Sequence, residues 1–250
     1  MKTALITGAS SGLGKEFIKQ VYQKFPEIEC FYLVARRKER LEEMQELLVG
    51  KSVKLLDLDL AKDESYEKLK SVFEEEKPEI SMLINNAGLG FWGSVKDLDY
   101  KKQINSCDVN VKAISALTAI TLPYMSKGSR IIFTSSIASF VPNAYMSVYC
   151  STKAYVNSYA RALRYELKKE KISVTITCPG PMATEFIEKG GVKSKTFEKL
   201  PYCNPEKVVK GTLKKAKKGK FVYTPKLFYK FYRVLSKILP TAWLMGAAKT

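Results

Sequence analysis

Short apolar segments typical of β-strands alternate along this chain with longer segments of helical periodicity. The predicted strands cover residues 3–7, 30–35, 52–60, 80–85, 130–135, 172–178 and 220–224. The predicted helices cover residues 15–25, 37–48, 63–76, about 99–125 and 148–168. Strict alternation of this kind predicts an α/β fold, in which a doubly wound parallel sheet carries helices on both faces.

The alternation continues without an internal repeat or a low-complexity linker to about residue 224. A chain of 250 residues can bury a sizeable core, and its 46% hydrophobic content argues against disorder. We therefore expect one domain over residues 1–224 and a separate C-terminal extension over residues 225–250.

Histidine is absent from the chain. This absence excludes Ser-His-Asp and Cys-His catalysis, and it excludes zinc sites that contain histidine. A proton donor must then be Tyr, Lys, Cys or a carboxylic acid. No metal site is predicted.

The five cysteines form no CxxC pair and their number is odd. Both observations argue against a disulfide framework and favour a reducing compartment. The first ten residues contain an apolar run of only three, too short for a secretory signal, and no apolar window is long enough to span a membrane. We therefore expect a cytoplasmic protein.

Positive charge is concentrated near the C-terminus. Residues 193–250 contain fifteen Lys or Arg against Glu198 and Glu206, a balance of +13 within a total of +17, so residues 1–192 carry only +4. The basic C-terminal region is therefore the part that requires an explanation.

Gly8, Gly12 and Gly14 lie in a turn between the first predicted strand and the first predicted helix. Glycines at this place allow a pyrophosphate to approach the backbone, and a helix N-terminus offers free N–H groups to it. A purely structural turn is the alternative, since the spacing is GxxxGxG rather than GxGxxG. The dinucleotide-binding hypothesis takes in the whole turn: Gly8, Ser10, Ser11, Gly12, Leu13 and Gly14.

Arg36 and Arg37 follow the second predicted strand, where an acidic residue would bind the 2′-hydroxyl of a ribose. Guanidinium groups suit a 2′-phosphate instead, because they bond to it in a bidentate manner. The sequence therefore predicts NADP(H) as cofactor. The alternative is that these arginines simply begin a charged surface helix.

Six motifs together resemble the short-chain dehydrogenase/reductase family, in the order and spacing of that family. They are TGASSGLG (7–14), NNAG (85–88), Asn110 in DVNV, the serine pair 135–136, YCSTK (149–153) and PGPMAT (179–184). The resemblance covers the chain to about residue 224. It implies a Rossmann-type fold and nicotinamide-dependent interconversion of a carbonyl and a secondary alcohol.

Tyr149 and Lys153 are four positions apart, so a helix places them on one face. A chance surface pair is the alternative. The pKa of an ordinary tyrosine is about 10, and a neighbouring ammonium is expected to lower it, which suits a general acid and base. The resemblance implies that Ser136 binds the substrate oxygen, with Ser135 directed away, and that Asn110 holds a water in a proton relay through Lys153.

The remaining cofactor residues are also implied by the resemblance. Asp59 and Leu60 would lie beside the adenine, although Asp57 is an alternative to Asp59. Lys153 would also bond to the nicotinamide ribose. Cys150 is not expected to act as a nucleophile. The residues expected at the adenine ribose are Asn86, Ala87 and Gly88, and those expected at the carboxamide are Pro179, Gly180 and Thr184.

Residues 225–240 predict an amphipathic helix bracketed by Pro225 and Pro240. Its basic residues recur at helical spacing, and large apolar residues fill the other faces. Two interpretations stay open: peripheral contact with an anionic membrane at its inner surface, or packing on this domain or a partner subunit. Nucleic acid is not expected as a partner, because no recognition motif accompanies the basic run 214–220. Since no cofactor motif follows Thr184, removal of the tail is expected to leave cofactor binding intact.

Candidate pocket residues are apolar and favour a lipophilic substrate, either acyl or steroid-like. The segment between Thr184 and Pro201 is expected to cover this pocket. We also expect a homodimer or homotetramer. A dinucleotide-binding sensor or scaffold without turnover is the alternative function. The candidate pocket residues are Leu89, Phe91, Trp92, Ile137, Phe140, Met146 and Met182.

Overall fold

The computed structural model describes residues 1–191 and 200–247. Its strands are β1 (Lys2–Thr7), β2 (Cys30–Ala35), β3 (Ser52–Asp57), β4 (Glu79–Asn85), β5 (Arg130–Thr134), β6 (Ser173–Thr177) and β7 (Val222–Tyr223). Its α-helices are α1 (Gly12–Lys24), α2 (Lys38–Glu46), α3 (Glu64–Glu76), α4 (Tyr100–Cys107), α5 (Ala113–Thr121), α6 (Ser147–Glu166), α7 (Glu185–Gly190), α9 (Pro205–Lys217), α10 (Leu227–Ile238) and α11 (Thr241–Ala247).

Within the described residues the strands form one parallel sheet in the order β3-β2-β1-β4-β5-β6-β7. The chain first winds outward from β1 to β3, then returns to β4 on the other side of β1. A crevice opens beside the carboxyl ends of β1 and β4, where the winding direction changes, and such crevices bind ligands in open α/β sheets. The predicted doubly wound parallel sheet is confirmed.

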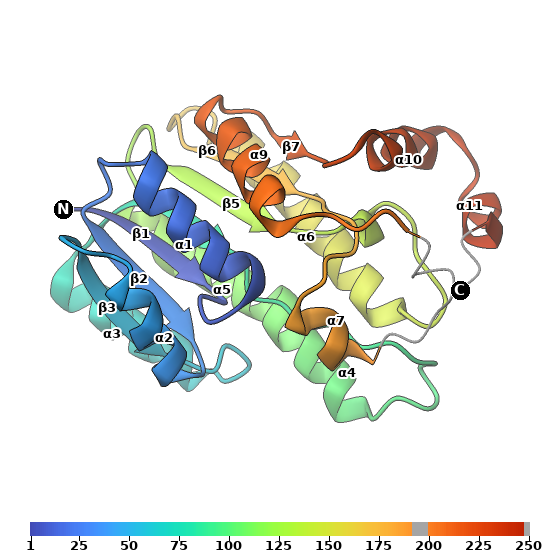
Figure 1. The fold of residues 1–250 in the computed structure, drawn as a ribbon, viewed down its shortest axis with the longest axis horizontal. Coiled ribbons are helices and arrows are strands. Elements are labelled where there is room, and N and C mark those ends of the chain that lie inside the picture. Colours follow the sequence, from blue (N-terminus) through green and yellow to red (C-terminus); the bar gives the residue numbers. More distant parts are fainter. Residues whose placement is uncertain (192–199, 248–250) are drawn as a thin grey trace.

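Helices cover both faces of the sheet, as Figure 1 shows. Helices α1, α2 and α9 pack on one face, and α3, α5 and α6 pack on the other. Adjacent residues of β1 therefore enter different cores: Leu5 joins the second set of helices, while Ala4 and Ile6 join the first. All six residues of β2 are buried, as expected for a parallel strand covered on both sides.

Two predicted elements differ in detail, and two further helices are present. The third strand ends at Asp57, so residues 58–60 lie in the loop beyond it. The helical region predicted over 99–125 contains α4 and α5 separated by a π-helical turn, Asp108–Lys112, and it closes in a 3-10 turn, Leu122–Tyr124. Helices α7 and α9 were not predicted as elements. The basic run 214–220 begins in the last turn of α9 and continues past its end at Lys217.

The C-terminal segment forms α10 and α11, and Pro225 and Pro240 bracket α10 as the sequence predicted. Figure 1 shows both helices at the end of the molecule toward which β1 and β5 run. Tyr229 of α10 is completely buried in the core that contains α1 and α9. Within the part of the chain that the structure describes, no helix has the length and apolarity needed to cross a membrane.

Candidate functional site

The turn after β1 requires glycine at several positions. Gly8 and Gly12 have φ values of +66° and +50°, a region that favours glycine. A Cβ atom on Gly14 would lie 1.9 Å from the carbonyl oxygen of Gly8. The Ser11 side chain makes no capping bond at the start of α1, so N–H groups at that helix end stay available. The turn therefore fits a pyrophosphate group.

Thr7 joins the glycine turn to the NNAG segment. Its Oγ1 accepts hydrogen bonds from the backbone N–H groups of Asn86 and Ala87, both at 3.0 Å. Asn86 Nδ2 donates to the Thr7 carbonyl oxygen at 3.1 Å. A Cβ atom on Gly8 would lie 3.0 Å from the Ala87 Cα. These contacts bring Gly8, Asn86, Ala87 and Gly88 together at the crevice, and Thr7 was missed although it begins the TGASSGLG motif.

Tyr149 and Lys153 lie on one face of α6, as predicted, and both are buried. Lys153 Nζ lies 5.7 Å from the centre of the Tyr149 ring. The Lys153 ammonium donates to the carbonyl oxygen of Thr134, at the end of β5, at 3.0 Å. The pair is therefore a buried feature and not a chance surface neighbour.

Burial dominates the ionisation of both groups. It raises the pKa of Tyr149 to about 12, because the charged phenolate loses solvation. It lowers the pKa of Lys153 to about 8 for the same reason, since the ammonium is the charged form. The predicted lowering of the Tyr149 pKa is therefore wrong. The cause is desolvation, which outweighs the attraction of an ammonium that bonds to a carbonyl instead.

The Ser136 side chain lies close enough to Tyr149 to oppose part of the rise in the tyrosine pKa. Its Oγ accepts from the N–H of Ala138 at 3.1 Å, which fixes the hydroxyl at the end of β5. Ser135 is directed elsewhere, because its Oγ donates to the Lys153 carbonyl oxygen at 3.2 Å. The predicted division between the two serines agrees with this geometry.

Asn110 lies within the π-helical turn and is fully buried. Its Oδ1 accepts from the Leu89 N–H at 2.8 Å, and its Nδ2 donates to the Leu89 carbonyl at 2.6 Å and to Thr152 Oγ1 at 3.0 Å. A Cβ atom on Gly88 would lie 3.3 Å from both Asn110 Oδ1 and Lys153 Nζ. The asparagine therefore ties the loop after β4 to α6 beside Lys153, while its part in a water relay stays a prediction.

Arg37 contacts Ser10, which is one of the predicted cofactor residues, and Glu185, which is not. It donates from Nη2 to Ser10 Oγ at 3.2 Å and pairs through Nη1 with Glu185 of α7 at 3.1 Å. Arg40 also pairs with Glu185. Arg36 is exposed and makes no hydrogen bond or ion pair to any residue that the structure describes. The acidic bridge by Glu185 was missed, because α7 was not predicted.

The remaining predicted cofactor residues follow β3 and β6. Asp59 Oδ1 accepts from the Ala61 N–H at 3.2 Å, and Leu60 is buried beside it. Asp57 ends β3 and is exposed. After β6, a Cβ atom on Gly180 would lie 2.3 Å from the Tyr229 ring, so glycine is needed there for packing against α10.

A cavity of about 530 Å³ lies beside the catalytic candidates. Gly8 and Gly12 line one part of it, and Ser136, Tyr149 and Lys153 line another. The lining also includes the predicted cofactor residues Ser11, Leu13, Asn86, Ala87, Gly88, Pro179, Gly180 and Thr184. The glycine turn and the catalytic candidates therefore line the same cavity.

Four of the candidate pocket residues line this cavity: Trp92, Ile137, Met146 and Met182. The other three do not. Asn110 holds the backbone of Leu89, Phe91 packs under Lys102 with 5.7 Å from Nζ to the ring centre, and Phe140 contacts Tyr232 at a ring distance of 6.2 Å. The cavity is also lined by residues that were not predicted: Phe186 of α7 and, from α10, Phe228, Tyr229, Phe231, Tyr232 and Leu235. Of the predicted cover between Thr184 and Pro201, residues 192–199 lie outside the described residues.

Residues 2–193 match the family model of the short chain dehydrogenases. The chain belongs to this family. A curated relative, the NADP-dependent 3-hydroxy acid dehydrogenase of Schizosaccharomyces pombe, is 35% identical over 74% of this chain and 73% of its own length. An uncharacterised oxidoreductase of Staphylococcus saprophyticus is 33% identical over 75% of this chain and 76% of its own length.

A solved short-chain dehydrogenase from Sphingobium yanoikuyae, in complex with NADPH, superposes with a TM-score of 0.81. It is 25% identical, and the alignment covers 97% of this chain and 98% of that one. The Rossmann-type fold expected from the sequence is thereby confirmed. This short-chain dehydrogenase is an oxidoreductase, and within its described residues no group of three His, Cys, Asp or Glu side chains gathers to hold a metal.

Proposed function

We propose that this short-chain dehydrogenase uses NADP(H) to interconvert a carbonyl and a secondary alcohol on a lipophilic substrate. One observation carries the proposal. Tyr149, Lys153 and Ser136 line the same cavity as the glycine turn, so a proton donor stands beside a space that fits a dinucleotide.

Several features support NADP(H) as the cofactor. The glycine turn and the free end of α1 fit a pyrophosphate. Arg36 and Arg37 follow β2, and guanidinium groups at this position are suited to a 2′-phosphate. The Schizosaccharomyces relative is NADP-dependent, and the Sphingobium structure contains NADPH. Asp59 and Leu60 would contact the adenine. The adenine ribose would be contacted by Asn86, Ala87 and Gly88. The carboxamide would be contacted by Pro179, Gly180 and Thr184.

The residues divide the chemistry among them. When bound, the nicotinamide supplies the hydride that adds to the carbonyl carbon. Tyr149 holds a proton in its dry site and gives it to the forming alkoxide, and in the reverse direction it removes that proton. Ser136 holds the substrate oxygen next to the phenol. Lys153 lies beside Tyr149 and would bond to the nicotinamide ribose, and Asn110 orients the loop after β4 next to Lys153.

The lining beyond the catalytic candidates supports a lipophilic substrate, either acyl or steroid-like. Trp92, Met146, Met182 and Phe186 surround the space next to Tyr149, and the aromatic residues of α10 continue it. Apolar walls with a few convergent polar groups are typical of sites that bind apolar ligands and orient them through one polar function.

We also propose the context in which the enzyme works. The chain acts as one catalytic domain over residues 1–224 with its extension packed on it, and it assembles as a homodimer or homotetramer. Its five free cysteines support a reducing compartment such as the cytoplasm.

A screen of aldehydes and ketones of increasing apolar size, with NADPH oxidation followed by absorbance, tests this function. We expect turnover with at least one bulky apolar ketone and little with sugars, and NADPH should support a higher rate than NADH. Binding of NADPH without turnover of any carbonyl, or of any alcohol with NADP⁺, would contradict the enzyme assignment.

A further inference from the structure

Helix α10 is held in one orientation by its buried side. Tyr229 is completely buried, its hydroxyl donates to the Pro201 carbonyl oxygen at 2.8 Å, and its ring packs against Gly180. Arg233 donates to Thr224 Oγ1 at 3.1 Å. These contacts fix which face of α10 is turned away from the domain.

The outward face of α10 carries an apolar stripe. Leu227, Phe231, Val234 and Ile238 are spaced at four, three and four residues, so they share one side of the helix. They are 81%, 63%, 49% and 71% exposed, and Trp243 of α11 is 70% exposed beside them in sequence. We call these five residues the outer stripe. The four residues on α10 form one exposed apolar face, and exposed apolar surfaces of this kind mark interaction sites.

Positive charge accompanies the outer stripe. Lys226, Lys230 and Lys237 are exposed on or next to α10, and no Asp or Glu occurs in the sequence after Glu206. An apolar face flanked by lysines complements the interface of an anionic bilayer. A second copy of this chain would place like charges opposite one another, which disfavours pairing through the same surface.

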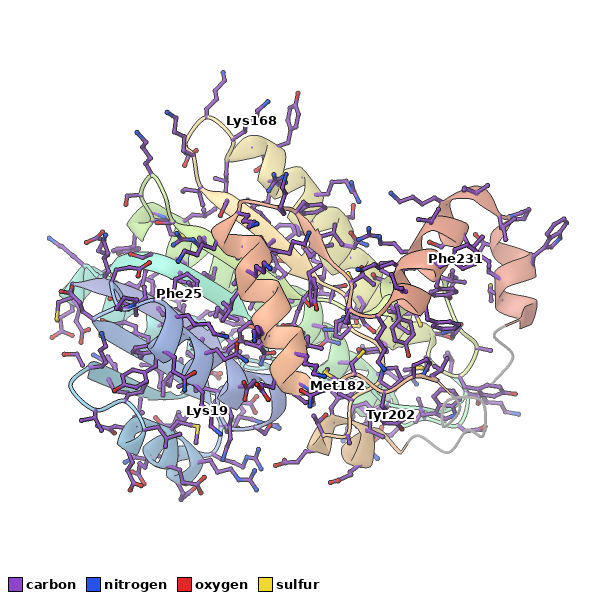
Figure 2. The ribbon with its side chains drawn as sticks, turned by 45° about the horizontal axis from the view of Figure 1, so that its top comes forward. Lys19, Phe25, Lys168, Met182, Tyr202 and Phe231 are labelled. Atoms are coloured by element: carbon purple, nitrogen blue, oxygen red, sulfur yellow. The ribbon has the colours of Figure 1, made fainter. Side chains whose placement is uncertain are left out.

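The outer stripe also borders the cavity of the proposed active site. Phe231 belongs to the stripe and lines the cavity, and Phe228 is 53% exposed and lines it as well. The cavity therefore reaches the surface at α10. Figure 2 shows Phe231 on this helix, well separated from Lys168, which lies in the turn just after α6.

We propose that the outer stripe and its lysines dock this protein on an anionic lipid surface, with the mouth of the cavity against the bilayer. Apolar substrates then reach Tyr149 from the lipid side without crossing water. The docking itself does not depend on the proposed function, although the purpose assigned to the cavity rests on it.

Sedimentation of the full-length protein with vesicles tests the docking. We expect binding to vesicles of phosphatidylcholine with phosphatidylserine, weaker binding to phosphatidylcholine alone, and release by salt. Each lysine near an anionic surface changes partitioning about fivefold, so Lys230→Glu with Lys237→Glu should weaken binding at least about 30-fold. The control Lys168→Glu with Lys169→Glu makes the same charge change elsewhere and should stay within about twofold.

The apolar part is tested with a second pair of variants. Leu227→Gln with Ile238→Gln should weaken vesicle binding at least about tenfold, since two aliphatic side chains no longer enter the lipid. Val49→Gln with Tyr165→Gln alters residues of similar exposure, 76% and 82%, and should not weaken it. In a Trp92→Phe variant, Trp243 is the only tryptophan, and its emission should shift to shorter wavelength when anionic vesicles are added.

Three results would overturn the proposal. They are equal binding to anionic and neutral vesicles, vesicle binding that the stripe variants retain, and an association of the protein with itself that Leu227→Gln with Ile238→Gln abolishes. The last result would assign the stripe to a second copy of the chain. None of these measurements uses substrate or turnover, so their failure is distinct from failure of the proposed function.

Discussion

Lys153 Nζ lies 5.7 Å from the centre of the Tyr149 ring and gives its hydrogen bond to the Thr134 carbonyl at 3.0 Å. The ammonium is therefore held at the end of β5, beside the phenol and not bonded to it. With its pKa raised to about 12, Tyr149 keeps its proton at neutral pH. This state suits a proton donor in carbonyl reduction.

The buried ammonium of Lys153 makes stability depend on pH. Its native pKa of about 8 is below its ordinary value of 10.5, so between these values the unfolded chain binds more protons than the native one, and stability rises with pH. Below pH 8 the native state carries the full cost of the buried charge. Lys153→Met removes this dependence, so its stability relative to the parent should be highest below pH 8 and decline toward pH 10.5. Urea unfolding across that range measures it, and a difference independent of pH would contradict the lowered pKa.

Arg36 should decide the preference for NADPH over NADH. Arg36→Asp removes an attraction to the 2′-phosphate and adds a repulsion, so NADPH affinity should fall by about one to two decades. NADH affinity should change little. Lys38→Asp makes the same charge change two positions later and serves as the control. Titration of both cofactors by fluorescence measures the effect, and an equal loss for NADPH and NADH would argue against the assignment.

Glu185 should compete with the 2′-phosphate for Arg37 and Arg40. Its carboxylate pairs with both arginines at a partly exposed site, where an ion pair contributes about 0.2–1 kcal/mol. Glu185→Gln should therefore raise NADPH affinity by about two- to fivefold and leave NADH affinity unchanged. Glu188→Gln, on the same helix, is the matched control. Weaker NADPH binding by Glu185→Gln would instead indicate that this carboxylate helps to hold the cofactor.

Tyr229 should support the loop that contains Gly180. Tyr229→Ala empties a fully buried aromatic site and should cost about 3–5 kcal/mol of stability. Because the ring packs on Gly180, the variant should also weaken NADPH binding, whereas the exposed Leu227→Gln should affect neither property. The sequence had predicted that the tail is dispensable for cofactor binding. Thermal unfolding measures the loss of stability, and NADPH titration measures the loss of affinity. Unchanged NADPH affinity in Tyr229→Ala would support the prediction from sequence that the tail is dispensable for cofactor binding.

Features that repeat along the chain could be predicted from the sequence. The apolar strands and the amphipathic helices follow from local periodicity, because a strand such as β2 must be buried on both faces in a parallel sheet. The glycine turn was recognisable because only glycine adopts the φ of Gly8 and Gly12 without strain. The shared face of Tyr149 and Lys153 follows from helical geometry alone.

Features that depend on contacts between distant segments could not be predicted. The packing of Tyr229 on Gly180 joins helix α10 to the loop after β6, two segments that no local pattern connects. The bridge from Glu185 to Arg37 requires the position of α7 relative to α2. The raised pKa of Tyr149 depends on how completely the surrounding elements exclude water, whereas spacing along a helix shows only which charges are near.

The turnover of Tyr149→Phe tests the central claim most directly. The control is Tyr155→Phe. Tyr155 lies on α6 with Tyr149, and its hydroxyl bonds to Ser115 of α5. With a ketone identified in the NADPH screen, Tyr149→Phe should bind NADPH as the parent does but turn over at least about 10²-fold more slowly, while Tyr155→Phe should retain its rate. Parental turnover by Tyr149→Phe would contradict the assignment of Tyr149 as the proton donor.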